Sequence, residues 1–325
     1  MDIYSIGGVP AEIKIDGLSF SYSSTPVLKD ITLDLTGPKF VSILGPNGVG
    51  KSTLIHCINK ILSPTGGTVM LDGKDVKDIT IKEMAKQVGY VPYSANDTFP
   101  LTVVDTVLMG RHPHSKWGSL DKDLDIVYDT LKMLGISHLA MRNFNELSAG
   151  QHQKVMLARG LVQEPKVLLL DEPTSNLDIR HQLDVTKMLK RLSEEKGILV
   201  IMISHDISIA AKFSDEIIML RDGAIYAAGT PNEVITEPNL EAVYGVKSRI
   251  VDDNGRPHVI LKDALPMDDL IESGDTPYPA MNRAIRSKKG TGGCGCGRRP
   301  GGRRRFGQRL IPAEAPKPFT DDIGE

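Results

Sequence analysis

Continuous apolar runs along the chain predict a sheet whose inner strands are covered on both faces. Residues 40–44, 167–170 and 198–203 are apolar throughout, apart from Ser42. Such runs are typical of parallel strands that have helices on both sides. A helical pattern over residues 179–196 separates the last two runs, so we expect a strand–helix–strand crossover unit there.

Alternating apolar and polar positions predict a second set of strands with one buried face. Residues 13–20 and 27–35 follow this pattern, which is typical of half-buried strands. The dipeptides Asp72-Gly73 and Asp222-Gly223 each follow a short strand-like run and indicate hairpin turns. We therefore expect antiparallel pairing in these parts of the chain.

The remaining sequence divides into a helical stretch and a polar tail. Residues 102–163 have helical character, with breaks near 111–118 and 143–148. Residues 263–325 are rich in Gly, Pro, Arg and acidic side chains and carry little periodic apolar content. Because such a segment cannot bury enough apolar surface to order itself, we expect most of it to be disordered.

A glycine-rich loop lies between the strand at 40–44 and a helical apolar pattern that runs from Leu54 to Leu62. It reads Gly45-Pro46-Asn47-Gly48-Val49-Gly50-Lys51-Ser52-Thr53 and fits the phosphate-binding pattern G-x-x-x-x-G-K-[ST]. Glycines let backbone N–H groups turn toward an anion, and the helix dipole adds positive potential. Lys51 is expected to reach the β- and γ-phosphates and Ser52 to bind Mg²⁺. The loop predicts nucleotide binding.

Three further groups follow strand ends or open a helix. Asp171 follows the run at 167–170 and suits a second magnesium contact, while Glu172 suits a general base for the attacking water. His205 follows the run at 198–203, at the edge of a parallel sheet where ligands bind. Ser148, in Leu147-Ser148-Ala149-Gly150-Gln151, opens a helix. The alternatives are a solvated Asp-Glu pair, a structural histidine and, for Ser148, a simple helix N-cap.

Composition excludes several other classes of protein. The chain of 325 residues is 40% hydrophobic and 25% charged, with a net charge of -2, which is ordinary for a globular protein and not for a polyelectrolyte binder. A single Trp argues against a stacking platform for single-stranded nucleic acid. Three cysteines make no disulfide framework, so we expect a reducing cytoplasm. No signal-peptide pattern or apolar run of about 18 residues is present, so any membrane crossing would come from another chain.

Five motifs occur in a fixed order: the phosphate loop, LSAGQ, VLLLDEP, SNLD and Ile203-Ser204-His205-Asp206. Together they resemble the ATP-binding subunit of an ABC transporter, over roughly residues 11–262. The resemblance implies an α/β P-loop ATPase domain with a mixed sheet core, an antiparallel β subdomain and a helical subdomain at about 93–146. The segment 263–325 would be the disordered tail.

The resemblance also implies roles for individual residues and a homodimer that sandwiches ATP. The signature of one copy, with Ser148, Gly150 and Gln151, would face the phosphate loop of the other copy and contact the γ-phosphate. His205 would hold the γ-phosphate from the same chain, and Asp178 would lie at the dimer seam. Tyr22 would stack on adenine, unless it is a core aromatic at a strand end.

Two positions depart from the family pattern. Ala149 replaces the first of the two glycines that the signature usually carries, which is a mild change if the backbone angle there is ordinary. Tyr93 stands where the family normally has a Gln that binds the magnesium shell and senses the membrane partner. A tyrosine hydroxyl lacks an amide carbonyl, so the usual magnesium contact is not expected at this position.

The chain between Tyr93 and the signature resembles importers of iron-siderophore, haem and cobalamin type. The similar segments are residues 99–103, residues 107–114 and Tyr244-Gly245-Val246. His112 and His114 could be metal ligands, but with no third ligand evident nearby a solvated loop is the better interpretation. In the tail, Cys294-Gly295-Cys296 could bind a soft metal or sense redox state. The arginine clusters nearby could contact anionic lipid or RNA. A solvated, disordered tail is the simpler interpretation of both.

The sequence therefore predicts an ATPase, with ATP and Mg²⁺, at the cytoplasmic face of the membrane. It would power uptake of a metal chelate through integral membrane permease subunits and, indirectly, an extracytoplasmic substrate-binding protein. No nucleic acid partner is expected. Two alternatives stay open. One is a non-transport ABC ATPase. The other is a nucleotide-gated regulatory module with weak hydrolysis, which Tyr93 and the tail support.

Overall fold

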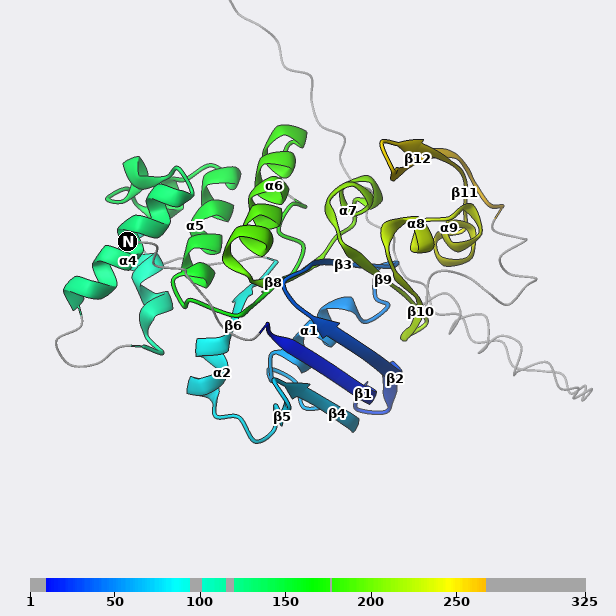
Figure 1. The fold of residues 1–325 in the computed structure, drawn as a ribbon, viewed down its shortest axis with the longest axis horizontal. Helices are drawn as coiled ribbons and strands as arrows, with labels where there is room; N and C mark the ends of the chain where they lie inside the picture. Colours follow the sequence, from blue (N-terminus) through cyan, green and yellow to red (C-terminus); the bar gives the residue numbers. More distant parts are fainter. Residues whose placement is uncertain (1–9, 94–100, 115–119, 176, 267–325) are drawn as a thin grey trace, which may run out of the picture.

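The computed structural model describes residues 10–93, 101–114, 120–175 and 177–266. Cys294, Cys296, the arginine clusters and nearly all of the predicted tail lie outside these ranges. Figure 1 shows a helical region around α4 and α5 on one side, a sheet in the middle, and the small C-terminal elements on the other side.

The central sheet has six strands in the order β10-β9-β3-β8-β7-β6. Its four neighbouring pairs from β9 to β6 are parallel, and β10 pairs with β9 in the antiparallel direction. The predicted mixed sheet and its crossover unit are confirmed. In chain order the strands are β3 (Phe40–Leu44), β6 (Val88–Val91), β7 (Val167–Leu170), β8 (Leu199–Ile203), β9 (Glu216–Arg221) and β10 (Ala224–Gly229).

A second, antiparallel sheet carries the alternating strands and has the order β2-β1-β4-β5. Along β1 every second side chain is buried in the first half of the strand, as the alternation predicts. A two-stranded hairpin, β11-β12, closes the described chain. These strands are β1 (Glu12–Tyr22), β2 (Thr25–Thr36), β4 (Gly66–Leu71), β5 (Lys74–Asp75), β11 (Val246–Asp253) and β12 (Arg256–Ala264).

Helices cover the central sheet and fill the stretch between β6 and β7, where helical character was predicted. The α-helices are α1 (Lys51–Ile58), α2 (Ile81–Gln87), α3 (Val103–Leu108), α4 (Leu120–Met133), α5 (Ala149–Leu161), α6 (Ile179–Lys196), α7 (Ile207–Phe213), α8 (Pro231–Val234) and α9 (Glu237–Tyr244). In the part of the chain that the structure describes, three single turns of 3₁₀ helix are η1 (Met109–Arg111), η2 (Ser137–Leu139) and η3 (Phe144–Glu146). No helix in the described ranges has the length and apolar content to cross a membrane.

Among the described residues, three apolar clusters hold these layers together, and each uses one part of the central sheet. One face of β3, β7 and β8 packs against α1 and the antiparallel sheet. The other face packs against α3 to α6. The end of β3 and the strand β9 pack against α7, α8, α9 and the hairpin. Because both faces are covered, every residue of β3, β7 and β8 is buried.

The structure differs from the sequence prediction in two places. The apolar spacing suggested a helix as far as Leu62, but α1 ends at Ile58, and Lys60 has a positive φ of 57° that is incompatible with continuing it. The hairpin β11–β12 was not predicted, and its second strand includes residues 263 and 264, where the tail was expected to begin.

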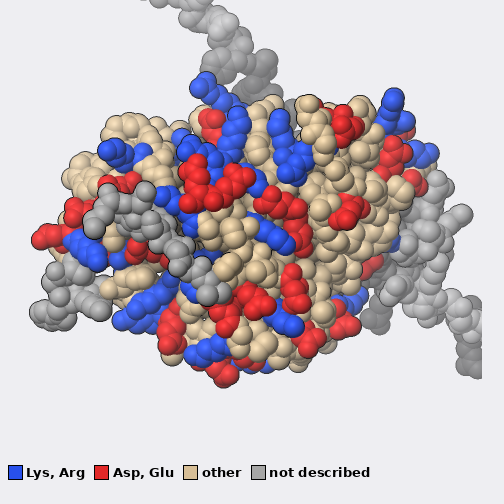
Figure 2. Space-filling view, in the orientation of Figure 1, with Lys and Arg blue, Asp and Glu red and all other residues tan. Residues whose placement is uncertain are grey.

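Charged side chains are mixed over the surface that Figure 2 shows. Lys and Arg alternate with Asp and Glu across this face, with no broad area of one sign. This arrangement matches the net charge of -2 and gives that face no electrostatic preference for a polyanion.

Candidate active site

The candidate site lies where three parallel strands end at one edge of the sheet. The strand β8 lies between β3 and β7, with Ile43 opposite Ile203 and Leu170 opposite Met202. The chain leaves these strands into the phosphate loop, into Asp171-Glu172 and into Ser204-His205. The three predicted elements therefore meet at the carboxyl edge, which is the usual place for a ligand in an α/β sheet.

Backbone shape explains the glycines of the phosphate loop. Gly50 has a φ of 108°, and a Cβ there would lie 2.7 Å from Cδ2 of Leu28. Gly45 has a φ of 147°, and a Cβ there would lie 2.5 Å from the carbonyl oxygen of Leu220. Since no other side chain fits either position, the sequence can form this loop only with glycine at both places.

Lys51 begins α1 and folds back over the loop. Its Nζ donates hydrogen bonds to the carbonyl oxygens of Gly45 at 2.8 Å and of Pro46 at 3.0 Å. Burial lowers the pKa of Lys51, and the charges of Glu172 and Asp171 act in the opposite direction. A buried ammonium among loop carbonyls, with two carboxylates close by, is suited to contact phosphate oxygens.

Ser52 and Asp171, the two predicted magnesium ligands, are in direct contact. The Ser52 hydroxyl donates a hydrogen bond to Oδ1 of Asp171 at 3.1 Å. Burial raises the pKa of Asp171, while the hydrogen bond from Ser52 acts to lower it. A hydroxyl and a partly desolvated carboxylate side by side supply the hard oxygen ligands that Mg²⁺ prefers.

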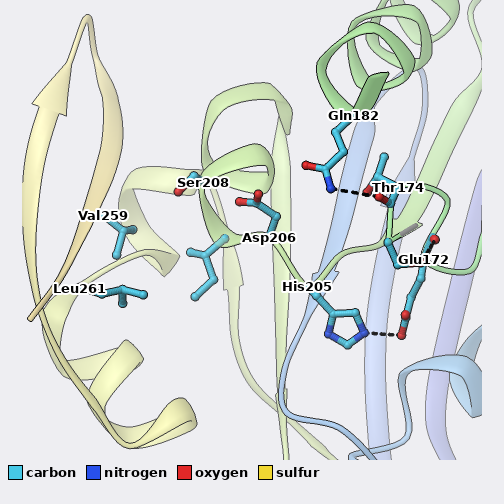
Figure 3. A pocket seen from close by; sticks show the side chains of 10 residues that line it. Glu172, Thr174, Gln182, His205, Asp206, Ser208, Val259 and Leu261 are labelled. Atoms are coloured by element: carbon cyan, nitrogen blue, oxygen red, sulfur yellow. Dashed lines mark hydrogen bonds and ion pairs between the residues drawn. The ribbon is translucent and has the colours of Figure 1, made fainter. Parts of the chain in front are cut away.

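Glu172 and His205, the predicted base and γ-phosphate contact, are also paired. His205 Nε2 meets Oε1 of Glu172, as Figure 3 shows. Glu172 has a positive φ of 50°, a strained backbone conformation that clusters at functional sites. Both side chains line a cavity of about 500 Å³, so they are open to a ligand or to water.

A second layer behind Asp171 was not predicted. The ring Nε2 of His56 on α1 lies 3.0 Å from the hydroxyl of Tyr90 on β6. Burial, and secondly the charge of Asp171, raise the pKa of Tyr90 to about 12. The charge of His56 acts to lower the pKa of Asp171. His56, Tyr90 and Asp171 lie in segments that are far apart in the sequence, and nothing in the sequence indicates that they meet.

The signature residues form the start of α5. Ser148 is the N-cap: its Oγ accepts a hydrogen bond from the N–H of Gln151 at 3.4 Å, and its own N–H donates to Oε1 of Gln151 at 3.1 Å. This capping box confirms the N-cap interpretation of Ser148 within one chain. Gly150 lies against His181, since a Cβ at that glycine would be 3.0 Å from the histidine ring.

Asp178 and Tyr22 lie at the ends of their elements and are accessible. Asp178 caps α6, where its carboxylate accepts from the N–H of His181 at 2.9 Å and meets the ring Nδ1 at 2.8 Å. Tyr22 ends β1, is 51% exposed and packs edge-on against Phe20. Its exposure argues against a purely core role, and its ring is free to take a further stacking partner.

The structure also describes Tyr93, which departs from the family pattern, and His114, one of the two histidines considered as metal ligands. Tyr93 is 49% exposed and directly follows β6 and Pro92. His114 Nε2 lies 2.8 Å from the carbonyl oxygen of Gln163, and nearby Arg111 forms a buried ion pair with Asp123 at 2.8 Å. His114 is therefore bound to the protein backbone, and in the described residues no cluster of metal-binding side chains gathers around it.

The hairpin contributes side chains to the cavity, which sequence reasoning missed. Val259 and Leu261 of β12 line the same cavity as Glu172 and His205 (Figure 3). Asn254 and Gly255 form the turn between β11 and β12, with φ of 55° and 81°. An Asn-Gly pair between apolar segments is a strong hairpin signal, and it could have revealed this element.

Comparison with known proteins identifies the family. The family model described as ABC transporter matches residues 28–175. An uncharacterised ABC transporter ATP-binding protein of Methanocaldococcus jannaschii, MJ0089, is 48% identical over 76% of this chain and 97% of its own length. The ferric enterobactin transport ATP-binding protein FepC of Escherichia coli is 35% identical over 77% and 94%. The dimeric structure of MJ0796, a bacterial ABC transporter cassette, has a TM-score of 0.61 at 31% identity, covering 67% of this chain and 98% of that one.

The chain belongs to the ABC transporter family, as an ATP-binding cassette with ATPase activity. The resemblance that the ordered motifs indicated, and the fold it implied, are thereby confirmed. Within the family, the similarity to FepC agrees with the resemblance to iron-siderophore proteins drawn from the segments after Tyr93.

Proposed function

We propose that this chain is the ATP-hydrolysing subunit of an ABC importer and powers uptake of a metal chelate through a separate permease. The observation that carries the proposal is the meeting of Ser52 with Asp171 and of Glu172 with His205 at one sheet edge. These pairs bring residues from three motifs into the arrangement that γ-phosphate hydrolysis requires. The similarity to FepC supports a metal chelate as cargo.

The residues of one chain divide the work of binding and hydrolysis. The backbone N–H groups of the loop around Gly48 and the ammonium of Lys51 hold the β- and γ-phosphates. Ser52 and Asp171 would hold Mg²⁺, which would supply positive charge to the phosphates. Glu172 orients the attacking water and accepts its proton, and His205 contacts the γ-phosphate. Tyr22, half exposed at the end of β1, stacks on adenine.

The proposed active unit has two copies of the chain. Ser148, Gly150 and Gln151 at the start of α5 in one copy face the phosphate loop of the other. A helix N-terminus is suited to this because its dipole attracts anions. Asp178 lies at the seam between the copies. Hydrolysis breaks the bond between the β- and γ-phosphates, and release of the γ-phosphate as inorganic phosphate removes the group that bridges the copies, so the dimer opens and moves the permease.

The partners and location follow from that cycle. The helical region from α3 to η3 and the adjacent Tyr93 contact integral membrane permease subunits at the cytoplasmic face. A substrate-binding protein on the other side delivers the chelate. The chain itself does not bind cargo, so its contribution to transport is the free energy of ATP hydrolysis.

Proteoliposome uptake tests this function. The full chain is purified together with its permease from membranes of the native host, and the complex is reconstituted with ATP and Mg²⁺ on the side of the chain. A ferric siderophore, haem or cobalamin should accumulate with wild-type protein and not with Lys51→Ala. If the complex hydrolyses ATP but moves none of these three chelates, the cargo class is wrong. If no membrane complex is obtained and the free chain is fully active, the transport role is wrong.

A further inference from the structure

Gln182, in the first turn of α6, is hydrogen-bonded to the turn that carries Glu172. Its Nε2 donates to the carbonyl oxygen of Thr174 at 3.1 Å. Figure 3 shows this bond beside the cavity that Gln182 and Thr174 line together with Glu172 and His205. None of the five ordered motifs includes Gln182, and the proposed division of work gives it no part.

The backbone of Glu172 has to be held in place by its surroundings. Its φ of 50° lies in the left-handed region, which costs free energy for a residue other than glycine. The next residue is Pro173, and a residue before proline normally takes an extended conformation. Since such a conformation persists only where neighbouring contacts fix it, the contacts of residues 172–175 determine where the Glu172 carboxylate points.

The turn after β7 is first closed by its own hydrogen bonds. The carbonyl oxygen of Glu172 accepts from the N–H of Ser175 at 3.3 Å and from its Oγ at 3.1 Å. The carbonyl oxygen of Thr174 accepts from the N–H of Leu177 at 3.2 Å. These bonds shape the turn but do not attach it to another element. The bond from Gln182 does so, because it joins the turn to α6.

The helix α6 is a rigid attachment point for this turn. Its residues Val185 and Leu189 are buried in the cluster that covers one face of the central sheet. The carbonyl oxygen of Gln182 accepts from the hydroxyl of Thr186 at 2.8 Å. Because its backbone is fixed within a packed helix, the side-chain amide of Gln182 holds the Thr174 carbonyl at a set place.

We propose that Gln182 is a positioning residue for hydrolysis, which holds residues 172–175 so that the Glu172 carboxylate stays directed at the attacking water. It acts through the backbone of Thr174 and not through a contact with ATP. The rate of hydrolysis then depends on the link between α6 and this turn. This inference rests on the proposed role of Glu172 as the general base.

The test is Gln182→Met in the full chain, purified with its permease, because methionine keeps the length of the side chain and removes the N–H donor. The kcat for ATP hydrolysis is expected to fall about three- to tenfold, the effect of losing one partly buried hydrogen bond. The KM for ATP should change less than about twofold, because the phosphate loop that binds ATP is untouched. Gln182→Glu at pH 8 turns a carboxylate toward the Thr174 carbonyl and should lower kcat further.

The matched control is Gln87→Met on α2. The side-chain amide of Gln87 also donates to a backbone carbonyl, that of Glu83 at 3.5 Å, and Gln87 is not among the residues that line the cavity. The same chemical change should leave both kcat and KM at their wild-type values, because the bond it removes lies within α2.

Two further measurements separate positioning from a loss of structure. Without nucleotide, Gln182→Met should melt within about 3 °C of the wild type. In the Glu172→Gln background, where the base is already absent, Gln182→Met should still form the dimer with ATP. Loss of that dimer, while Glu172→Gln alone forms it, would overturn the inference, because Gln182 would then act on the contact between the copies.

The kinetic constants decide the remaining outcomes. A wild-type kcat in Gln182→Met would overturn the inference, as would a raised KM with unchanged kcat. A kcat in Gln182→Glu that equals or exceeds that of Gln182→Met would also contradict it. A wild-type complex that hydrolyses no ATP would instead refute the proposed function on which the inference rests.

Discussion

The Ser52 hydroxyl donates a hydrogen bond to Oδ1 of Asp171 at 3.1 Å, across 119 positions of sequence. Ser52 lies in the first turn of α1, and Asp171 follows β7. The contact exists because β8 lies between β3 and β7 and all three strands end at one edge. This hydrogen bond places the two oxygen ligands proposed for Mg²⁺ side by side.

Removing the Ser52 hydroxyl should affect the metal more than the phosphate. Ser52→Ala deletes one hard oxygen ligand, so the Mg²⁺ concentration needed for half-maximal ATPase activity should rise about tenfold, which corresponds to about 1.4 kcal/mol of lost binding free energy. Steady-state phosphate release at varied Mg²⁺ measures this. Ser52→Thr keeps a hydroxyl and should behave like the wild type. Equal Mg²⁺ dependence in the Ala variant would contradict the assignment of Ser52.

The charge of Asp171 is expected to lower the free energy of unfolding in the absence of metal. Because burial raises its pKa, its ionisation destabilises the fold. That cost is absent below the ordinary aspartate pKa of about 3.9, grows as pH rises through the raised pKa and is complete above it. Asp171→Asn removes the charge and keeps an oxygen that can accept from Ser52.

The variant should therefore melt higher than the wild type, by about 2 °C at pH 8 and by less at pH 4, in buffer without Mg²⁺ or nucleotide. Scanning calorimetry at the two pH values measures the difference. Asp184→Asn, at an exposed position of α6, is the matched control and should show no such trend. A variant that melts lower than the wild type at pH 8 would show that the charge of Asp171 stabilises the fold.

Tyr22 is predicted to hold adenine by stacking. Base–aromatic stacking contributes about 1–3 kcal/mol, and the ring is 51% exposed at the end of β1. Tyr22→Ala should weaken ATP binding about tenfold, and Tyr22→Phe should retain it because the ring alone stacks. Titration with a fluorescent ATP analogue distinguishes them. If the Ala variant binds as tightly as the wild type, adenine is held elsewhere.

Tyr93 is predicted to limit coupling to the membrane partner. Tyr93→Gln supplies the amide carbonyl that the family normally has at this position, so it should leave ATP affinity intact and raise hydrolysis in the complete assembly. Tyr93→Phe, which adds no carbonyl, is the control. Unchanged turnover of the Gln variant together with its permease would count against this role and would strengthen the alternative of a weakly hydrolysing regulatory module.

The sequence predicted those parts of the molecule that depend on local pattern. Continuous apolar runs predicted β3, β7 and β8, because buried strands require apolar residues. Glycine spacing predicted the phosphate loop, because positive φ angles favour glycine. Contacts between distant segments do not select residue types in this way. The pair of His56 with Tyr90 depends on how the layers pack, and no short window of sequence contains both residues.

Two errors came from signals that were present but incomplete. The apolar residues Ile61 and Leu62 continued the helical spacing of α1, yet the left-handed Lys60 ends it, which only the packing of the following loop determines. The hairpin β11–β12 was obscured because both faces of β12 carry exposed apolar side chains, Ile260 at 44% and Leu261 at 64% exposure. Its alternation was therefore weak, although the Asn254-Gly255 turn was visible.

The most direct test of the account is the mass of Glu172→Gln in solution with ATP and Mg²⁺. The substitution removes the base and keeps the shape, so ATP stays bound and two copies should remain closed on it. Light scattering after size exclusion should show the mass doubling from 35.4 kDa on addition of ATP, while Lys51→Ala in the same background stays monomeric. A Glu172→Gln protein that binds ATP and remains a monomer at all concentrations would contradict the claim that two copies enclose the nucleotide.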